Sequence, residues 1–200
     1  MTYDTYFDIT LNPDVGGDPD AVPAWEALSL AWRAVHGASR RTETPFAVAF
    51  PRWMREGFTL GGVMRIFVQG MDVADRLYDA IDEVPQWQAW AYGSRIRKVP
   101  KEPQAYESYR MRRLPSGVSR QRKTITLEEQ LALRDRARSR ILVQQQGLPF
   151  VRMRSSSGNL FRLVIERQYV SAPTDGVPNS YGLSRATQVV AVPIWEARPA

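Results

Sequence analysis

Residues 147–165 have the sequence GLPFVRMRSSSGNLFRLVI, in which two apolar runs enclose a short polar turn. The turn contains three serines, Gly158 and Asn159, and the flanking runs are rich in β-branched and aromatic residues. This pattern predicts a β-hairpin. The side chains around its tip suit a phosphate and a base better than a hydrophobic core: Arg152, Arg154, Ser155, Ser156, Ser157, Phe161 and Arg162.

The segment before the hairpin is strongly basic. Between residues 106 and 123 Glu107 is the only acid, whereas six cations occur there: Arg110, Arg112, Arg113, Arg120, Arg122 and Lys123. Arg110 and Arg112 have the spacing of side chains on one side of an extended segment. Ser116 can cap a short helix that would hold the last three cations. Because these charges repel one another, the segment favours an anionic partner.

A long helix is predicted between the basic segment and the hairpin. Thr126 and Glu129 have the spacing of a capping box, and Gly147 is a typical helix end. An apolar stripe runs along Leu133, Ala137 and Ile141. Four arginines flank this stripe, and the spacing leaves open whether they face solvent or contact nucleic acid: Arg134, Arg136, Arg138 and Arg140.

The two halves of the chain differ in charge. Residues 1–98 contain ten Lys and Arg against thirteen Asp and Glu, a balance of −3. Residues 99–200 contain seventeen against eight, a balance of +9. This asymmetry predicts that a polyanion binds mainly to the second half, with a merely solvated basic surface as the alternative.

The first half alternates strand and helix patterns. Alternation predicts a strand over residues 3–11, and compact apolar runs predict strands over 46–50, 63–68 and 87–92. Two amphipathic helices are expected between them. The stripe of the first is Val22, Trp25, Leu28, Trp32 and Val35, ending near His36 and Gly37, and that of the second is Val73, Leu77, Ile81 and Val84.

The resulting order, βαββαβ, is that of the ferredoxin-like fold. The prediction is an α+β protein with a ferredoxin-like domain at residues 1–98, which carries His36. A C-terminal α+β domain at 99–200 would contain the arginine-rich segment, the serine hairpin and a last strand at 189–192. Core packing is expected for four of the tryptophans, rather than stacking on a ligand: Trp25, Trp32, Trp87 and Trp90.

The composition excludes several classes of site. Without cysteine the chain has no disulfides, no thiolate metal site and no cysteine nucleophile. Its single histidine, His36, does not favour a zinc site, and no cofactor is expected. No apolar run has membrane-spanning length and the N-terminus does not resemble a signal peptide, so a cytoplasmic protein is expected.

Motifs along the whole chain resemble one known family. They are residues 6–14 (YFDITLNPD), His36 ahead of Phe50 and Pro51, 148–151 (LPFV), 154–157 (RSSS), 161–163 (FRL), 181–184 (YGLS) and the pair Val192 and Pro193. In this order they resemble the CRISPR-associated endoribonuclease that processes precursor CRISPR RNA in type I-F systems, the Csy-type repeat-cleaving protein. Arg112 stands where the family pattern has glutamine.

The resemblance implies a protein that binds the stem-loop of CRISPR repeat RNA and cuts at the 3′ base of the stem. It would then stay on its product as a subunit of a crRNA-guided complex, chiefly beside the backbone subunit. His36 would serve as general base or proton shuttle, Ser155 would hold the ribose and Tyr181 would orient the histidine. The implied RNA contacts are Ser157 to the backbone, Phe161 to the closing base pair, and Arg110 and Arg112 to base edges near the cut. Arg120, Arg122 and Lys123 would line the major groove of the stem, and Arg113 and Arg154 are further expected RNA contacts.

The residue inventory agrees with the implied chemistry. Attack by a ribose 2′-OH on the adjacent phosphate needs an aligned nucleophile and a proton acceptor with a pKa near neutrality, but no metal. It leaves a 2′,3′-cyclic phosphate and a 5′-OH. The alternative is a non-catalytic module that binds an RNA stem-loop with the same basic residues, and in which His36 is structural.

Overall fold

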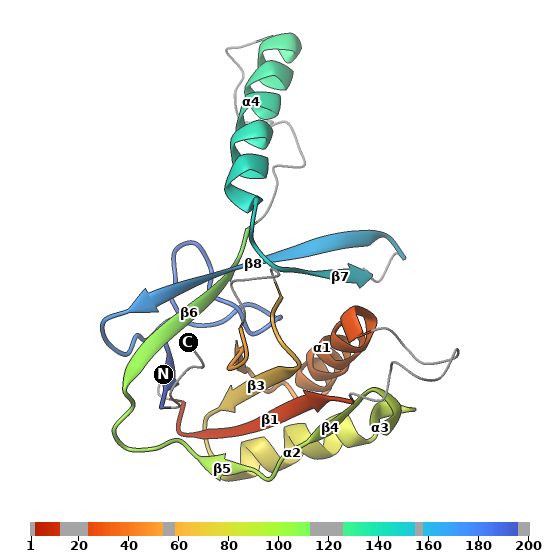
Figure 1. The fold of residues 1–200 in the computed structure, drawn as a ribbon, viewed down its shortest axis with the longest axis vertical. Helices are drawn as coiled ribbons and strands as arrows, with labels where there is room; N and C mark the ends of the chain where they lie inside the picture. The colour runs from red at the N-terminus through yellow and green to blue at the C-terminus, as the bar shows by residue number, and fades with distance from the viewer. Residues whose placement is uncertain (1–2, 13–23, 54–58, 113–125, 155–157, 196–200) are drawn as a thin grey trace.

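The computed structural model describes residues 3–12, 24–53, 59–112, 126–154 and 158–195. These residues form two antiparallel sheets, one from each half of the chain, and four helices. Figure 1 shows the N-terminal sheet with its helices at one end of the molecule, the second sheet beside it, and helix α4 (Leu127–Gln145) extending away from both.

The first sheet contains β1 (Thr5–Leu11), β2 (Ala47–Ala49), β3 (Val63–Val68) and β4 (Ala91–Gly93), with β5 (Arg97–Lys98) also paired to β1. Its strand order is β2-β3-β1-β4, and all pairs are antiparallel. Helices α1 (Ala24–Arg41) and α2 (Met71–Asp82) contact β1 and each other. This connectivity and strand order confirm the predicted α+β, ferredoxin-like fold.

The first helix is longer than its apolar stripe predicted. It does not end at His36 and Gly37 but continues to Arg41. Val35 and Ala38, on either side of this pair, are fully buried. Their burial outweighs the cost of about 1 kcal/mol for a glycine inside a helix. The expected start of this helix at residues 18–22 lies outside the described residues.

Residues 87–92 were expected to form a strand, but only their last part does. A short helix, α3 (Trp87–Trp90), comes first and β4 follows it. The change of structure turns the Trp87 side chain into the core, where it is almost completely buried. An apolar run of this length does not by itself distinguish a strand from a buried helical turn.

The second sheet has the strand order β7-β8-β6-β9 and is antiparallel throughout. Strands β7 (Phe150–Arg154) and β8 (Leu160–Val170) form the predicted hairpin, and β6 (Ala105–Met111) pairs with the far half of β8. The last strand, β9 (Val192–Ile194), begins later than expected. Residues 190 and 191 do not pair as a strand because side chains take their backbone N–H groups. Ser184 Oγ accepts the N–H of Val190, and Thr174 Oγ1 accepts that of Ala191.

Helix α4 begins at the predicted capping box. Thr126 Oγ1 accepts the backbone N–H of Glu129, and the Glu129 carboxylate accepts the backbone N–H of Thr126. Gln146 is the C-cap and Gly147 follows with a φ of 76°, as expected of a glycine helix end. The apolar stripe is only partly covered, since Leu133 remains 43% exposed.

One continuous hydrophobic core joins the two sheets. It includes Phe7 and Trp32 from the first half and Tyr109 and Leu163 from the second. Trp32 and Trp87 are buried, and Trp90 packs partly buried against the core, so core packing is confirmed for these three. Among the described residues no helix combines the length and apolar character needed to cross a bilayer.

Candidate functional site

The candidate site centres on a contact between His36 of α1 and Tyr181 of the loop before β9. Their rings are stacked, with centroids 4.6 Å apart and planes inclined by 13°. Both side chains are half-buried. The contact therefore joins the ferredoxin-like half of the chain to the C-terminal half, and it brings together two residues that were expected to share a site.

Hydrogen bonds to its backbone hold Tyr181 in place. The indole Nε1 of Trp32, one turn before His36 on α1, donates to the Tyr181 carbonyl at 3.0 Å. The Asn179 side-chain oxygen accepts the N–H of Tyr181 at 2.8 Å and that of Leu183 at 3.2 Å. The helix that carries the histidine thus also positions the tyrosine.

Gly182 and Ser184, which follow Tyr181 in the same loop, connect this loop to both sheets. Gly182 has a φ of 77°, and its carbonyl accepts the N–H of Val48 in β2 at 3.0 Å. Ser184 shares a buried hydrogen bond of 2.7 Å with Ser108 in β6. The sequence Tyr-Gly-Leu-Ser is therefore hydrogen-bonded to both sheets. Its glycine adopts a positive φ, which residues with a side chain disfavour.

We expect Gly182→Ala to lower the free energy of unfolding by about 1–3 kcal/mol, because an added Cβ would lie 2.5 Å from the Phe46 ring at a positive φ. The measurement is chemical denaturation. Gly158→Ala is the matched control, since Gly158 also has a positive φ (83°) but nothing within 4 Å of the added Cβ. Equal losses in the two variants would show that the Phe46 contact contributes nothing.

The surroundings of His36 favour its neutral form. Burial lowers the pKa of the imidazole, and the nearby guanidinium of Arg40 lowers it further. At neutral pH the ring is consequently uncharged and able to accept a proton.

The pH dependence of any reaction that uses His36 as a base follows from this. The rate should rise as pH increases through the pKa of His36, reaching its plateau at a lower pH than for an ordinary histidine. Arg40→Gln removes one of the two lowering effects, so the plateau should move to higher pH. The measurement is the single-turnover rate against pH; an unchanged profile would show that Arg40 does not act on the titrating group.

The hairpin is docked on the helix that carries His36. Ser29 Oγ of α1 donates to the Arg152 carbonyl of β7 at 2.5 Å and contacts Met153 Sδ at 3.7 Å. Figure 1 shows α1 lying alongside β7. The sequence did not predict that Ser29 would hold the hairpin. The one feature of the sequence that could have indicated this contact is a polar residue on the buried side of α1.

The described part of the hairpin places some of the expected residues. Phe161, opposite Met153, is half-buried and packs against the core. Arg154 is exposed at the end of β7. Ser155 and Ser157, expected to hold the ribose and the backbone, lie outside the described residues.

A second group of expected residues lies on one face of the second sheet. Arg110 of β6 pairs in register with Glu166 of β8, and Arg112 follows β6. Both arginines form ion pairs with the Glu166 carboxylate. Because residues two apart on a strand share a face, Arg162 lies on this face too, directly opposite Arg152. Glu166 was not among the residues expected from the sequence.

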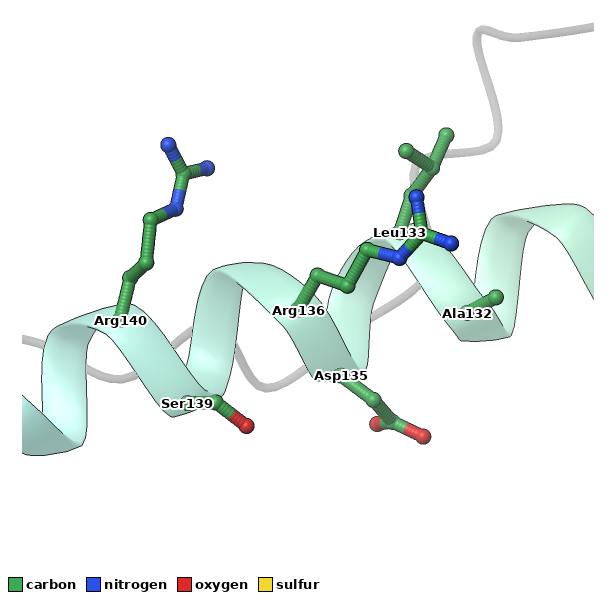
Figure 2. Close-up of a pocket in the computed structure, with 6 residues that line it drawn as sticks. All are labelled: Ala132, Leu133, Asp135, Arg136, Ser139 and Arg140. Atoms are coloured by element: carbon green, nitrogen blue, oxygen red, sulfur yellow. The ribbon is translucent and has the colours of Figure 1, made fainter.

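The remaining expected cations are only partly described. Arg113, Arg120, Arg122 and Lys123 lie outside the described residues. On α4, Arg134 pairs with its neighbour Asp135. Figure 2 shows a hollow on this helix, where Arg136 and Arg140 extend to one side while Asp135 and Ser139 point to another. Within the described ranges no three acidic or histidine side chains are grouped to hold a metal ion.

Comparisons with known proteins complete this description. No curated protein gives a significant match to the sequence. Among solved structures, the chain aligns with one described as the CRISPR endoribonuclease Cse3 bound to a 19-nt RNA, with 16% sequence identity and a TM-score of 0.33; the alignment covers 96% of this chain and 100% of the other. The assignment comes instead from the sequence model of a family described as CRISPR-associated protein (Cas_Csy4), which matches residues 6–195. This match confirms the resemblance carried by the motifs, and the chain belongs to the Cas_Csy4 family of CRISPR-associated proteins.

Proposed function

We propose that this protein is an endoribonuclease that binds the stem-loop of CRISPR repeat RNA and cuts at the 3′ base of the stem without a metal ion. The observation that supports this most directly is the stacked pair of His36 and Tyr181. It provides a fixed imidazole with a lowered pKa in a chain of a CRISPR-associated family. The alternative, a structural histidine that merely packs against an aromatic ring, is tested by replacing His36.

The proposed reaction is an internal transesterification. The neutral imidazole of His36 accepts the proton of the ribose 2′-OH, whose oxygen forms a bond to the adjacent phosphorus. The bond from phosphorus to the 5′ oxygen breaks, and the leaving oxygen takes up a proton, either from the histidine acting as a shuttle or from solvent. The products are a 2′,3′-cyclic phosphate and a 5′-OH. Alignment of the 2′-OH supplies much of the acceleration.

The other site residues have binding roles in this proposal. Ser155 holds the ribose of the cleaved nucleotide and Tyr181 keeps the imidazole in plane. Phe161 stacks on the closing base pair, and Arg110 and Arg112 contact base edges near the end of the stem. Side chains reach those edges only where the A-form major groove opens. Ser157 and the cations of the C-terminal half contact the RNA backbone: Arg113, Arg120, Arg122, Lys123 and Arg154.

The proposal includes the fate of the product. After cleavage the protein remains on the crRNA as a subunit of a type I-F surveillance complex, in contact with the backbone subunit, in the cytoplasm where the transcript is made. We further propose that residues 1–98 supply the base while residues 99–200 supply most of the RNA contacts. The charge balances of the two halves, −3 and +9, support this division.

The test is incubation of the protein with its repeat hairpin in EDTA, followed by analysis of the RNA ends. A single cut that leaves a 2′,3′-cyclic phosphate and a 5′-OH is expected. Hairpin that is bound but uncut, with or without added Mg²⁺, would instead support the non-catalytic RNA-binding module. Cleavage that stops in EDTA and leaves a 5′-phosphate would contradict the metal-independent reaction.

A further inference from the structure

Glu166 links the two arginines that are proposed to contact bases. Its carboxylate accepts from Arg110 Nε through Oε2 and, at 2.8 Å, from Arg112 Nη2 through Oε1. One oxygen serves each guanidinium, so a single acid holds both cations. The backbone register supports this arrangement, because Glu166 of β8 lies directly opposite Arg110 of β6.

The three side chains are neither fully buried nor freely exposed. Side-chain exposure is 29% for Arg110, 31% for Arg112 and 19% for Glu166. Partial burial alone would raise the pKa of Glu166, but hydrogen bonds from Arg110 and Arg112 hold it below its usual value. The carboxylate consequently stays ionised at neutral pH and offsets the repulsion between two cations on the same sheet face.

Arg112 is also fixed through its backbone. Its N–H donates to the Val164 carbonyl at 2.9 Å, and its own carbonyl accepts from Gln145 Nε2 at the end of α4 at 2.9 Å. The backbone of Arg112 is therefore held by hydrogen bonds, and its guanidinium is held by the Glu166 carboxylate. An arginine held at both ends loses little further rotamer freedom when it binds a ligand.

The guanidinium donors that Glu166 leaves available are suited to bases. Each guanidinium has five N–H donors, and Glu166 occupies one nitrogen of each. Among the described residues Arg112 Nε is buried with no hydrogen-bond partner, so the donors of Arg112 that can meet a base are those on its Nη atoms. Two donors of a planar fork match O6 and N7 of guanine, the commonest specific arginine contact to a base. A carboxylate behind the fork fixes the plane in which it can meet the base edge.

We propose that Glu166 is a positioning residue that orients Arg110 and Arg112 for base contacts and thereby determines which stem-loop the protein prefers. This inference rests on the proposed function, since it requires RNA at the same face. In this inference the preference for one RNA sequence over another depends on Glu166, an acidic residue that lies between two arginines. Without the acid, both arginines would be free to bind phosphates of any sequence.

The test compares wild type with Glu166→Gln, which keeps the size of the side chain but loses its charge. Each protein is given the hairpin from the repeat array that neighbours its gene, and hairpins with the closing base pairs exchanged. The Kd values are measured at one salt concentration. The ratio of Kd values between exchanged and native hairpins should fall roughly 10- to 100-fold in the variant. Weaker binding of the native hairpin and equal or tighter binding of the exchanged ones should together produce this change.

Control variants separate positioning from charge and from folding. Asp75→Asn on α2 makes the same change of net charge at an exposed position and should leave the ratio unchanged. Glu166→Asp keeps the charge and should restore part of the ratio. Thermal denaturation establishes that each variant is folded at the assay temperature.

The outcomes are distinct. A variant that binds all hairpins more tightly with the wild-type ratio would show that Glu166 only repels RNA, and an unaltered ratio and affinity would show that it has no role in recognition. Either result overturns the inference while leaving the proposed function intact. Wild-type protein that binds the hairpins without distinguishing them would also overturn the inference, whereas wild-type protein that binds none of them would contradict the proposed function.

Discussion

Replacing His36 with alanine should lower the single-turnover rate of RNA cleavage by about 10²–10⁴-fold, the range that a positioned general base contributes. The affinity for the hairpin should change little, because the uncharged imidazole adds no ion pair to the phosphates. Rate and affinity are measured separately, the first with enzyme in excess and the second by equilibrium binding to a hairpin whose cleavage-site ribose carries a 2′-deoxy substitution.

His36→Gln is the companion variant. Glutamine approaches the size of histidine and can form hydrogen bonds, but it does not take up a proton near neutral pH. It should therefore be as inactive as alanine while preserving more of the contact with Tyr181. Cleavage by either variant at the wild-type rate would remove His36 from the mechanism, and an equal loss of binding would assign it to recognition.

The parts of the fold that the sequence predicted well are those set by neighbouring residues. The hairpin β7–β8 follows from alternating side chains around a polar turn, and the start of α4 follows from the capping box of Thr126 and Glu129. The errors arose where distant packing decided the structure. Gly37 is a local signal to end a helix, but burial of Val35 and Ala38 against the rest of the core carries α1 onward.

The same distinction applies to the candidate site. Local spacing does not identify Tyr181 as a site residue, and only the family resemblance pairs it with His36. The pairing depends on long-range contacts, such as that from Trp32 to the Tyr181 carbonyl, which local patterns do not encode. Glu166 was missed for a related reason. Its signal is its position opposite Arg110, which is visible only once the register of β6 and β8 is known.

Trp32 is the residue whose replacement should affect both the fold and the site. Its side chain is fully buried, packs 5.4 Å from the Phe50 ring centroid and donates to the Tyr181 carbonyl. Trp32→Ala should lower the free energy of unfolding by about 3–5 kcal/mol. That is a large part of the roughly 5–15 kcal/mol that stabilises a typical domain. The measurement is chemical denaturation at equilibrium.

Trp32→Phe tests the link from the core to the site without emptying the core. Phenylalanine fills much of the same space but leaves the Tyr181 carbonyl without its donor, which should cost about 1–3 kcal/mol of stability. Because Tyr181 then loses one of its anchors, the cleavage rate of the folded variant should fall while its RNA affinity stays near that of wild type. Trp87→Phe, a buried substitution on α3, is the matched control and should lower stability without changing the rate. If both variants cleave at the wild-type rate, the indole supports only the core, and His36 and Tyr181 hold their geometry without it.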